Sequence, residues 1–348
     1  MLFRSSAIDD AATNRIWRFD LAAPGQPRAI TTTPSFGSLA VATSGGAKPA
    51  AVALRQSFSE PPTLVRLDLA SGAATRLTDF NDAPLEGVRM GKVQSVTYPG
   101  SGGAPIQMWV VYPPGFDAAK KYPVLMLLHG GPHNGIQDAM QWRWNAQVFA
   151  GWGYVVTWHN FHGSSGFGQG FADSINPDWI TKPYADTIAA AQWVTTQPWA
   201  DADRMVAAGA SYGGFLGATL LGRPHPFKAL VVHAGVYNKY TQIAADFGAE
   251  KDRFFEFWER PEEFARYSPH TSAGNFATPT LVIHGQQDLR VPVNHGIELF
   301  NALQKRGVPS KFVYFPDENH WVLKPQNSLY WYATVREWVE KYAPPGAR

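Results

Sequence analysis

Short, fully apolar runs alternate with helical patterns from residue 124 onward, and this alternation constrains the fold more than any other feature. The runs at 124–128 and 154–158 have the length of strands and no polar face, as expected for strands buried on both sides. Helical periodicity follows at 182–196, at 296–305 and at 328–341. Further apolar strands are expected at 205–208, 230–232, 280–283 and 311–315. Strands that alternate with helices predict an α/β fold with a doubly wound, mostly parallel sheet.

The first 85 residues have a different pattern. Alternating apolar and polar residues at 16–21 and 63–69, separated by glycine, proline and serine, predict β-strands. A strand, an Asp-Leu-Ala turn and a second short strand begin at Phe19 and again at Leu67, and this spacing of about 48 residues is close to that of β-propeller blades. We therefore divide the chain into a β-rich segment at 1–85 and an α/β domain at 86–348.

Composition excludes several classes of protein. Apolar residues make up 45% of the chain and charged residues 17%, which suffices for a large core and excludes a disordered chain. The formal net charge is only +2, so no basic field is available for nucleic acid or an anionic membrane. No apolar run reaches the ~18 residues of a membrane helix. We expect neither nucleic acid nor membrane as a partner.

Cysteine is absent, and no export signal is recognised. Without cysteine there is no disulfide, thiolate metal site or cysteine nucleophile. The N-terminus becomes acidic at Asp9 and Asp10 before any apolar signal core forms. The expected location is therefore the cytoplasm, unless a longer parent chain carries an export signal.

The most specific motif is Gly-Ala-Ser-Tyr-Gly at 209–213, directly after the strand at 205–208 and before a helical stretch. A G-x-S-x-G motif between strand and helix is typical of the nucleophile elbow of α/β-hydrolases. Glycines are needed there because neighbouring backbone approaches a strained turn closely. A glycine-rich turn that merely contains serine is the alternative, and the flanking strand and helix argue against it. We predict that Ser211 is the nucleophile.

A serine hydroxyl needs a base to take its proton, and the base needs a third group to orient it. In this fold the order is serine, acid, histidine, each just past a strand end. Asp288 and His320 each follow a predicted strand. Asp317 and Glu318 are rival acids, but they lie too close in sequence to His320 to occupy a separate strand end. The predicted triad is therefore Ser211, Asp288 and His320.

The sequence His-Gly-Gly-Pro-His at 129–133 follows the strand at 124–128, where a lipase-like oxyanion loop belongs. We predict that the backbone N–H groups of Gly131 and Tyr212 stabilise the oxyanion, since Pro132 has no N–H. The two histidines of this loop are a weak metal motif, because they lie on a loop without an H-E-x-x-H pattern. No nucleotide-binding glycine motif occurs either. We expect no metal and no cofactor.

Aromatic residues close to these motifs are candidates for a substrate pocket. Trp142 and Trp144 follow the predicted oxyanion loop, and Phe254, Phe257 and Trp258 lie between the serine and the acid. Core filling is the simpler explanation for each residue alone. As a group, the second set could form a wall of the pocket that takes the acyl-side residue.

The motifs above, together with Asn-Phe-His-Gly-Ser-Ser-Gly-Phe-Gly at 160–168, resemble the catalytic domain of the prolyl oligopeptidase family. The similarity extends from about residue 92 to residue 342 and is strongest to the dipeptidyl-peptidase and acylaminoacyl-peptidase branch. The resemblance implies an α/β-hydrolase fold and a serine hydrolase that cleaves short peptides. It also implies the triad and the two oxyanion donors named above.

Two features depart from the family pattern. His162 stands where members usually carry arginine, which affects the expected structure of its loop. In addition, a complete β-propeller precedes the catalytic domain in the family, whereas the segment at 1–85 resembles only the last blades. We therefore expect a truncated member or a fragment, and we expect its exposed strand edges to favour self-association.

Three functions remain compatible with the sequence. The first is a serine peptidase acting on short peptides through an acyl-enzyme, and the second is a carboxylesterase acting on small esters with the same triad. The third is a non-catalytic α/β-hydrolase scaffold, against which an intact triad argues. The triad does not specify the leaving group, so the expected partner is a short peptide or a small ester.

Overall fold

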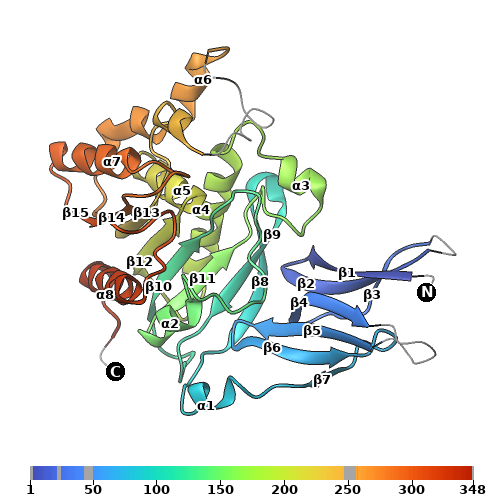
Figure 1. Cartoon of the computed structure of the whole chain (residues 1–348). Coiled ribbons are helices and arrows are strands. Elements are labelled where there is room, and N and C mark those ends of the chain that lie inside the picture. The colour runs from blue at the N-terminus through green and yellow to red at the C-terminus, as the bar shows by residue number, and fades with distance from the viewer. Residues whose placement is uncertain (1–2, 22–24, 43–49, 247–255, 257, 347–348) are drawn as a thin grey trace.

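An eight-stranded sheet forms the centre of the C-terminal part (Figure 1). The computed structural model describes residues 3–21, 25–42, 50–246, 256 and 258–346. The strand order is β15-β14-β13-β12-β10-β11-β9-β8. In chain order the strands are β8 (Val93–Pro99), β9 (Pro105–Val111), β10 (Tyr122–Leu128), β11 (Val155–His159), β12 (Ala200–Ala210), β13 (Ala229–His233), β14 (Thr280–Gly285) and β15 (Ser310–Phe315).

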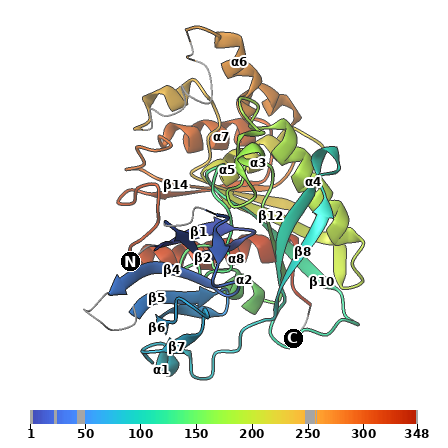
Figure 2. The same cartoon turned by 90° about the vertical axis from the view of Figure 1, so that its right-hand side faces the viewer.

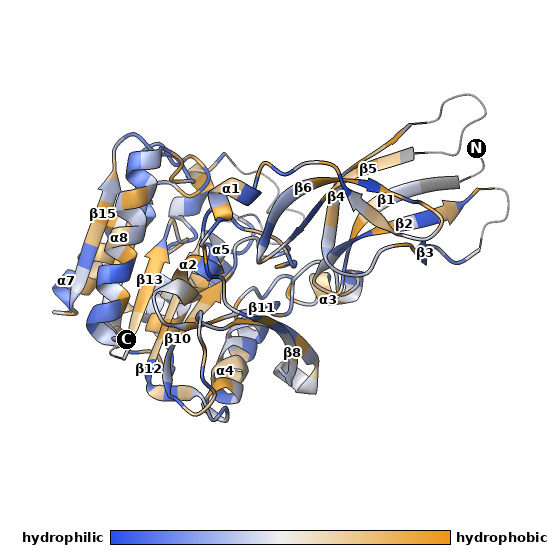
Figure 3. Ribbon diagram, turned by 90° about the horizontal axis from the view of Figure 1, so that it is seen from below, coloured by the Kyte–Doolittle hydropathy of each residue, from blue (hydrophilic) through white to orange (hydrophobic). Residues whose placement is uncertain are grey.

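The pairing within this sheet is parallel from β11 to β15, whereas β9 pairs antiparallel with both β11 and β8. The predicted doubly wound, mostly parallel sheet is therefore confirmed. The apolar runs expected to be buried lie in its middle, where β11 and β13 are buried along their whole length. Figure 3 shows the apolar colouring on β12 and β13.

Helices cover both faces of this sheet, and alternate residues of β10 show how the two faces are divided. Val124, Met126 and Leu128 belong to one apolar cluster, and Leu125 and Leu127 belong to the other. The first cluster also contains side chains of α4 (Thr181–Thr195), α5 (Tyr212–Leu221) and α7 (Asn294–Lys305). The second contains side chains of α2 (Ala146–Gly151) and α8 (Pro325–Tyr342). The predicted helices at 182–196, 296–305 and 328–341 correspond to α4, α7 and α8.

The remaining helical segments are short connections around the sheet. They are α1 (Asp82–Leu85), η1 (Ser101–Gly103), α3 (Gln169–Asp173), η2 (Thr241–Ala244), α6 (Pro261–Arg266) and η4 (Pro269–Asn275). Among the described residues, no helix combines the length and the hydropathy that crossing a lipid bilayer would require.

The N-terminal residues form two smaller antiparallel sheets beside the strands β8 and β9 (Figures 1 and 2). The first contains β1 (Phe3–Asp10), β2 (Thr13–Asp20) and β3 (Arg28–Ala29), and the second contains β4 (Ser35–Ala42), β5 (Ala50–Ser57), β6 (Glu60–Leu67) and β7 (Ala74–Arg76). Four antiparallel strands are the usual size of a propeller blade. Both sheets share a small apolar core around Ile16, Phe36 and Val65. A domain boundary near residue 85 stays a prediction.

The N-terminal sheets contact the α/β part close to the loop at 160–168. The Ala11 N–H donates to the Gly166 carbonyl at 2.8 Å, and the Phe58 N–H donates to the Asp138 carboxylate at 2.9 Å. The rings of Phe58 and Trp109 are 5.3 Å apart. The turn between β1 and β2 therefore packs directly on the loop at 160–168, which carries one of the motifs of the family resemblance.

Candidate active site

Ser211 lies in the sharp turn between β12 and α5. Its backbone has φ 60° and ψ −120°, a conformation that costs free energy for any residue with a side chain. Two backbone hydrogen bonds hold the turn: the Ser211 N–H donates to the His233 carbonyl at 3.0 Å, and the Ser211 carbonyl accepts from the Phe215 N–H at 2.9 Å. Both flanking elements therefore hold the strained turn in place. The turn presents the hydroxyl at the carboxyl ends of the strands.

The glycines around this turn are required by close backbone approach. A Cβ on Gly213 would lie 2.0 Å from the Leu128 carbonyl oxygen, and one on Gly209 would lie 2.6 Å from the Gly213 carbonyl. A Cβ on Gly214 would lie 2.6 Å from the Gly235 Cα. The ends of β10 and β13 thus pack against the turn at distances that only glycine permits.

Replacing Gly213 with alanine should lower the free energy of unfolding by about 3 kcal/mol or more, because neither backbone can move without disrupting the sheet. Urea unfolding measures the change. The matched control is Gly170→Ala, since a Cβ at Gly170 in α3 meets nothing within 4 Å. Equal stability of the two variants would contradict the packing described for the turn.

Asp288 and His320 lie at the ends of β14 and β15 and form a buried pair. The Nδ1 of His320 is 2.8 Å from the Asp288 Oδ2, and Asp288 Oδ1 accepts from the backbone N–H groups of Arg290 and Val291 at 2.9 and 2.8 Å. Burial opposes ionisation of this carboxyl, but hydrogen bonds from His284 and His320 outweigh it and hold the pKa of Asp288 well below its usual range. A carboxylate acceptor requires the proton on Nδ1, which leaves the His320 Nε2 able to accept a proton.

The two rival acids have other partners. Asp317 is half-buried and pairs with the Lys324 ammonium at 2.6 Å, whereas buried Glu318 accepts from the backbone N–H groups of Leu323 and Lys324. Both carboxylates therefore hold the loop that leads into α8. The ring of His320 hydrogen-bonds Asp288 instead.

The loop at 129–133 lies directly against Ser211. A Cβ built on Gly130 would be 3.4 Å from the Ser211 Cβ and 3.9 Å from its hydroxyl oxygen. Tyr212 is the first residue of α5, and the first N–H groups of a helix have no partner within the helix. This end of α5 and the adjoining glycine loop thus bring backbone donors to the side of Ser211. The proposed donors are the N–H groups of Gly131 and Tyr212.

His129 is part of the support of this loop. Its ring stacks on Phe161 with centroids 3.9 Å apart, and its Nε2 is 2.9 Å from the Ser164 hydroxyl. Burial lowers the pKa of His129 to about 3, so the ring is neutral. Within the described part of the chain, no group of three or more His, Cys, Asp or Glu side chains is arranged to hold a metal ion.

His162, for which the sequence analysis expected an effect on its loop, hydrogen-bonds a buried carboxylate. Both its Nδ1 and its backbone N–H lie 2.7 Å from Asp186 Oδ2, and the other oxygen of Asp186 accepts from the Ser101 N–H at 2.7 Å. The ring of His162 also stacks on Phe171. His162 therefore ties the loop at 160–168 to α4, on which Asp186 lies.

The aromatic residues proposed for the substrate pocket are distributed over different surroundings. Trp142 and Trp258 are exposed at 69% and 65%. Trp144 packs edge-on against Trp331, with ring centroids 4.7 Å apart. Phe254 and Phe257 lie outside the described residues. A substrate pocket formed by this group stays a prediction.

Two groups near the pair were not predicted from the sequence. His284 lies four residues before Asp288; its Nε2 is 2.8 Å from the Val291 carbonyl and 3.4 Å from the Asp288 Oδ2. The guanidinium of Arg143 stacks on the ring of Trp321 at 3.7 Å. His284 lies only four residues before Asp288, so its closeness to the predicted acid could have been noticed in the sequence. No neighbouring residue indicates that Arg143 lies near the site.

Buried neutral histidines make the fold sensitive to acid. Burial lowers the pKa to about 3 for three of them and to about 4 for two more: His129, His233 and His295, then His159 and His225. Unfolded histidines titrate near ~6.5, so below that pH the unfolded chain binds more protons than the native one and stability is lost. Each histidine contributes at most ~1.4 kcal/mol per pH unit.

We therefore expect the melting temperature to fall by at least about 10 °C between pH 7 and pH 5.5. Circular dichroism melts across this range measure it, with reversibility checked at each pH. A melting temperature that stays constant down to pH 5.5 would show that these rings are not neutral and buried.

The comparisons with known proteins agree with the geometry. The sequence pattern of the prolyl oligopeptidase family matches residues 140–345. A probable dipeptidyl-peptidase 5 of Aspergillus terreus is 44% identical over 245 residues, which cover 68% of this chain and 34% of the relative. Dipeptidyl-peptidase 5 of Schizosaccharomyces pombe is 37% identical over 300 residues, which cover 83% of this chain and 42% of the relative. This chain thus spans well under half the length of either relative.

The fold is also that of solved structures. An acylaminoacyl peptidase of Pyrococcus horikoshii superposes with a TM-score of 0.86 at 20% identity, covering 99% of this chain and 55% of that one. The fold and the turn at Ser211 therefore define an α/β-hydrolase. With the family pattern matched over more than half of its length, the chain belongs to the prolyl oligopeptidase family.

Proposed function

We propose that this chain is the catalytic part of a serine peptidase that cleaves short peptides through an acyl-enzyme on Ser211. The observation that carries the proposal is the buried hydrogen bond between His320 and Asp288, at the same edge of the sheet as the strained turn at Ser211. Family membership and the names of the relatives support the class of reaction.

In the proposed mechanism, the Ser211 hydroxyl attacks the substrate carbonyl while the His320 Nε2 takes its proton. Asp288 keeps the other ring proton on Nδ1 and stabilises the imidazolium. The N–H groups of Gly131 and Tyr212 donate to the oxyanion, each worth about 3 kcal/mol in the transition state. The imidazolium then protonates the leaving amine as the C–N bond breaks. Water, deprotonated by the same ring, releases the acyl group and restores Ser211.

The proposed substrates are short peptides. The relatives are named dipeptidyl-peptidase and the solved structure acylaminoacyl peptidase, and both names describe enzymes that release a small unit from a peptide end. Because this chain matches only part of each relative, the acyl-side preference of those proteins is not transferred to it. A carboxylesterase using the same three residues is the second candidate.

We expect short-chain nitrophenyl esters to be hydrolysed at least about tenfold faster than dipeptidyl anilides. Contacts remote from the scissile bond supply much of the preference for peptides, and an activated ester depends on them less. A nitrophenolate also leaves with little help from His320. Side-by-side kcat/KM values decide the matter, and faster cleavage of the anilides would contradict this expectation.

A further inference from the structure

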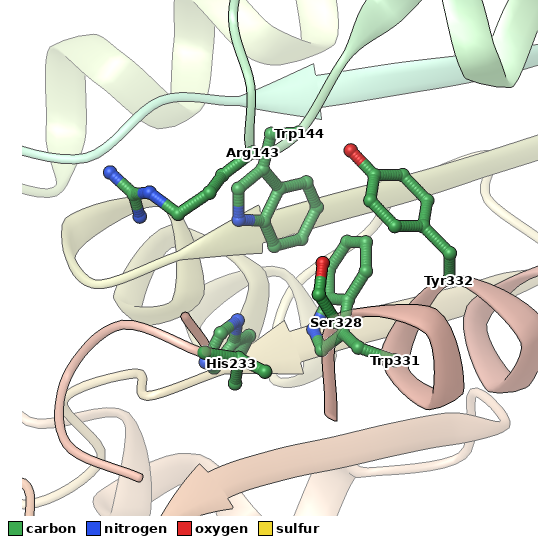
Figure 4. A pocket seen from close by; sticks show the side chains of 7 residues that line it. Arg143, Trp144, His233, Ser328, Trp331 and Tyr332 are labelled. Carbon is green, nitrogen blue, oxygen red and sulfur yellow. The ribbon is translucent and has the colours of Figure 1, made fainter. Parts of the chain in front are cut away.

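A small pocket lies beside His320, between the segment that follows the oxyanion loop and the start of α8 (Figure 4). Its volume is about 20 Å³, which is room for about one atom group of the size of a water molecule. Its aromatic lining consists of Trp144, Trp331 and Tyr332, and Val322 and Ser328 also line it. Figure 4 shows Arg143 and His233 on the same side of this space.

Hydrogen-bond donors without partners line the pocket. Both ring nitrogens of His233 and the indole Nε1 of Trp331 are buried without a partner in the structure, and each side chain is only 4% exposed. Buried polar groups nearly always have a partner, so exceptions need an explanation. Burial lowers the pKa of His233 to about 3, so its neutral ring offers one N–H donor, as the indole of Trp331 does.

Arg143 adds a positive charge to this set of donors. Its guanidinium is half-buried and stacks on Trp321 at 3.7 Å. Burial lowers the pKa of Arg143 from its ordinary value, but a guanidinium stays charged. The described residues provide no carboxylate partner for it. A partly desolvated cation beside unpaired N–H donors is an arrangement suited to an anion, because both interactions strengthen away from water.

The pocket is connected to His320 through Trp321, on whose ring Arg143 stacks. The rings of Trp321 and His320 are 5.0 Å apart, so Arg143 is separated from His320 by a single ring. The carbonyl of His233 also accepts the Ser211 N–H at 3.0 Å. Because His320 has to protonate the departing amine, the leaving part of a peptide passes close to this ring.

We propose that the pocket binds the free α-carboxylate of the leaving peptide, with Arg143 and the N–H groups of Trp331 and His233 as donors. The inference rests on the proposed peptidase function and specifies its substrate class: peptides whose C-terminus lies one or two residues beyond the scissile bond. A residue of extended chain spans about 3.5 Å, and a longer leaving peptide would place its carboxylate beyond this pocket.

The test uses matched tripeptides and tetrapeptides that end either in a free carboxylate or in a C-terminal amide. A charged hydrogen bond of about 2 kcal/mol corresponds to about a 30-fold difference, so wild-type kcat/KM should favour the acids by ~10–100-fold. Arg143→Gln should bring the ratio of acid to amide close to one, and Arg143→Lys should restore part of it. Trp331→Phe, which keeps a ring but removes the N–H, should lower the ratio several-fold.

The matched control is Arg336→Gln. Arg336 also has its guanidinium over a tryptophan ring, Trp152 at 6.0 Å, but it lies on α8 and pairs with Glu340 at 2.7 Å. This variant should keep the wild-type ratio. A second measurement needs no variant: free dipeptides should inhibit anilide hydrolysis at least tenfold more strongly than their amides.

Equal rates for acid and amide in the wild type, or an unchanged ratio in Arg143→Gln, would overturn the assignment of the pocket. In either case the peptides would still be hydrolysed. Failure of the proposed function is a different result, namely no hydrolysis of any peptide that depends on Ser211.

Discussion

Replacing Ser211 with alanine should lower kcat on a dipeptidyl anilide by about 10⁶-fold. The hydroxyl oxygen is the only protein atom that forms a covalent bond to the substrate in the proposed mechanism, so without it no acyl-enzyme can form. Residual activity of ~10³–10⁴ over the uncatalysed rate is expected from the backbone donors and from binding. The fold should persist, because the backbone hydrogen bonds of the turn do not involve the hydroxyl.

The control for this variant is Ser310→Ala. Ser310 is the first residue of β15. It therefore lies at the amino ends of the parallel strands, whereas the turn at Ser211 lies at their carboxyl ends. Its hydroxyl donates to the Val308 carbonyl at 3.2 Å. The control should keep kcat within about twofold. If Ser211→Ala retained a tenth of the wild-type activity, the proposed nucleophile would be wrong.

Replacing Asp288 with asparagine should lower kcat by about 10⁴-fold. The amide keeps the shape of the side chain, and its oxygen can still accept from the Arg290 and Val291 N–H groups. Its NH₂ group would face the Nδ1 of His320 and donate to it. The ring would then carry its proton on Nε2, where it could no longer accept one from Ser211.

The matched variant is Asp317→Asn, because Asp317 lies close to His320 in sequence but pairs with Lys324 at the surface. Losing its exposed pair with Lys324 should cost little stability and change kcat by less than about threefold. A mild effect at Asp288 together with a large effect at Asp317 would reverse the assignment of the acid.

Local sequence patterns account for most of the α/β part. Strands such as β11 and β13 are fully buried, so their apolar runs are continuous and easy to recognise. The turn at Ser211 is predictable for a related reason: its geometry imposes glycine at fixed positions, and the backbone contacts of Gly209 and Gly213 explain both. In both cases, burial of a strand and close backbone approach at a turn restrict the residue types at a few neighbouring positions, so the sequence alone indicates the structure.

The surroundings of the site were harder to predict because they depend on contacts between distant segments. Arg143 stacks on a residue about 180 positions later in the chain, and His233 meets Trp331 only because β13 and α8 pack together. The partner of His162, Asp186, lies on α4. No period or spacing in the sequence encodes these pairs, since each is decided by how the helices pack on the sheet.

The N-terminal strands were predicted from the sequence, but their association with other chains was not tested. Alternation predicted strands at 16–21 and 63–69, and β2 and β6 lie there. Among the described residues, these sheets end in the strands β1, β3, β4 and β7, and unpaired strand edges favour pairing with another chain. Self-association through these edges stays a prediction, which light scattering over a range of protein concentrations would test.

The central claim is that Ser211 is a nucleophile activated by His320, and covalent labelling tests it most directly. The protein is incubated with a fluorophosphonate, digested, and mapped by mass spectrometry. A single adduct on Ser211 is expected, formed in step with the loss of anilide hydrolysis and far more slowly in Asp288→Asn. An adduct on another serine, or no adduct in a folded protein, would contradict the account; the second result would favour a non-catalytic scaffold.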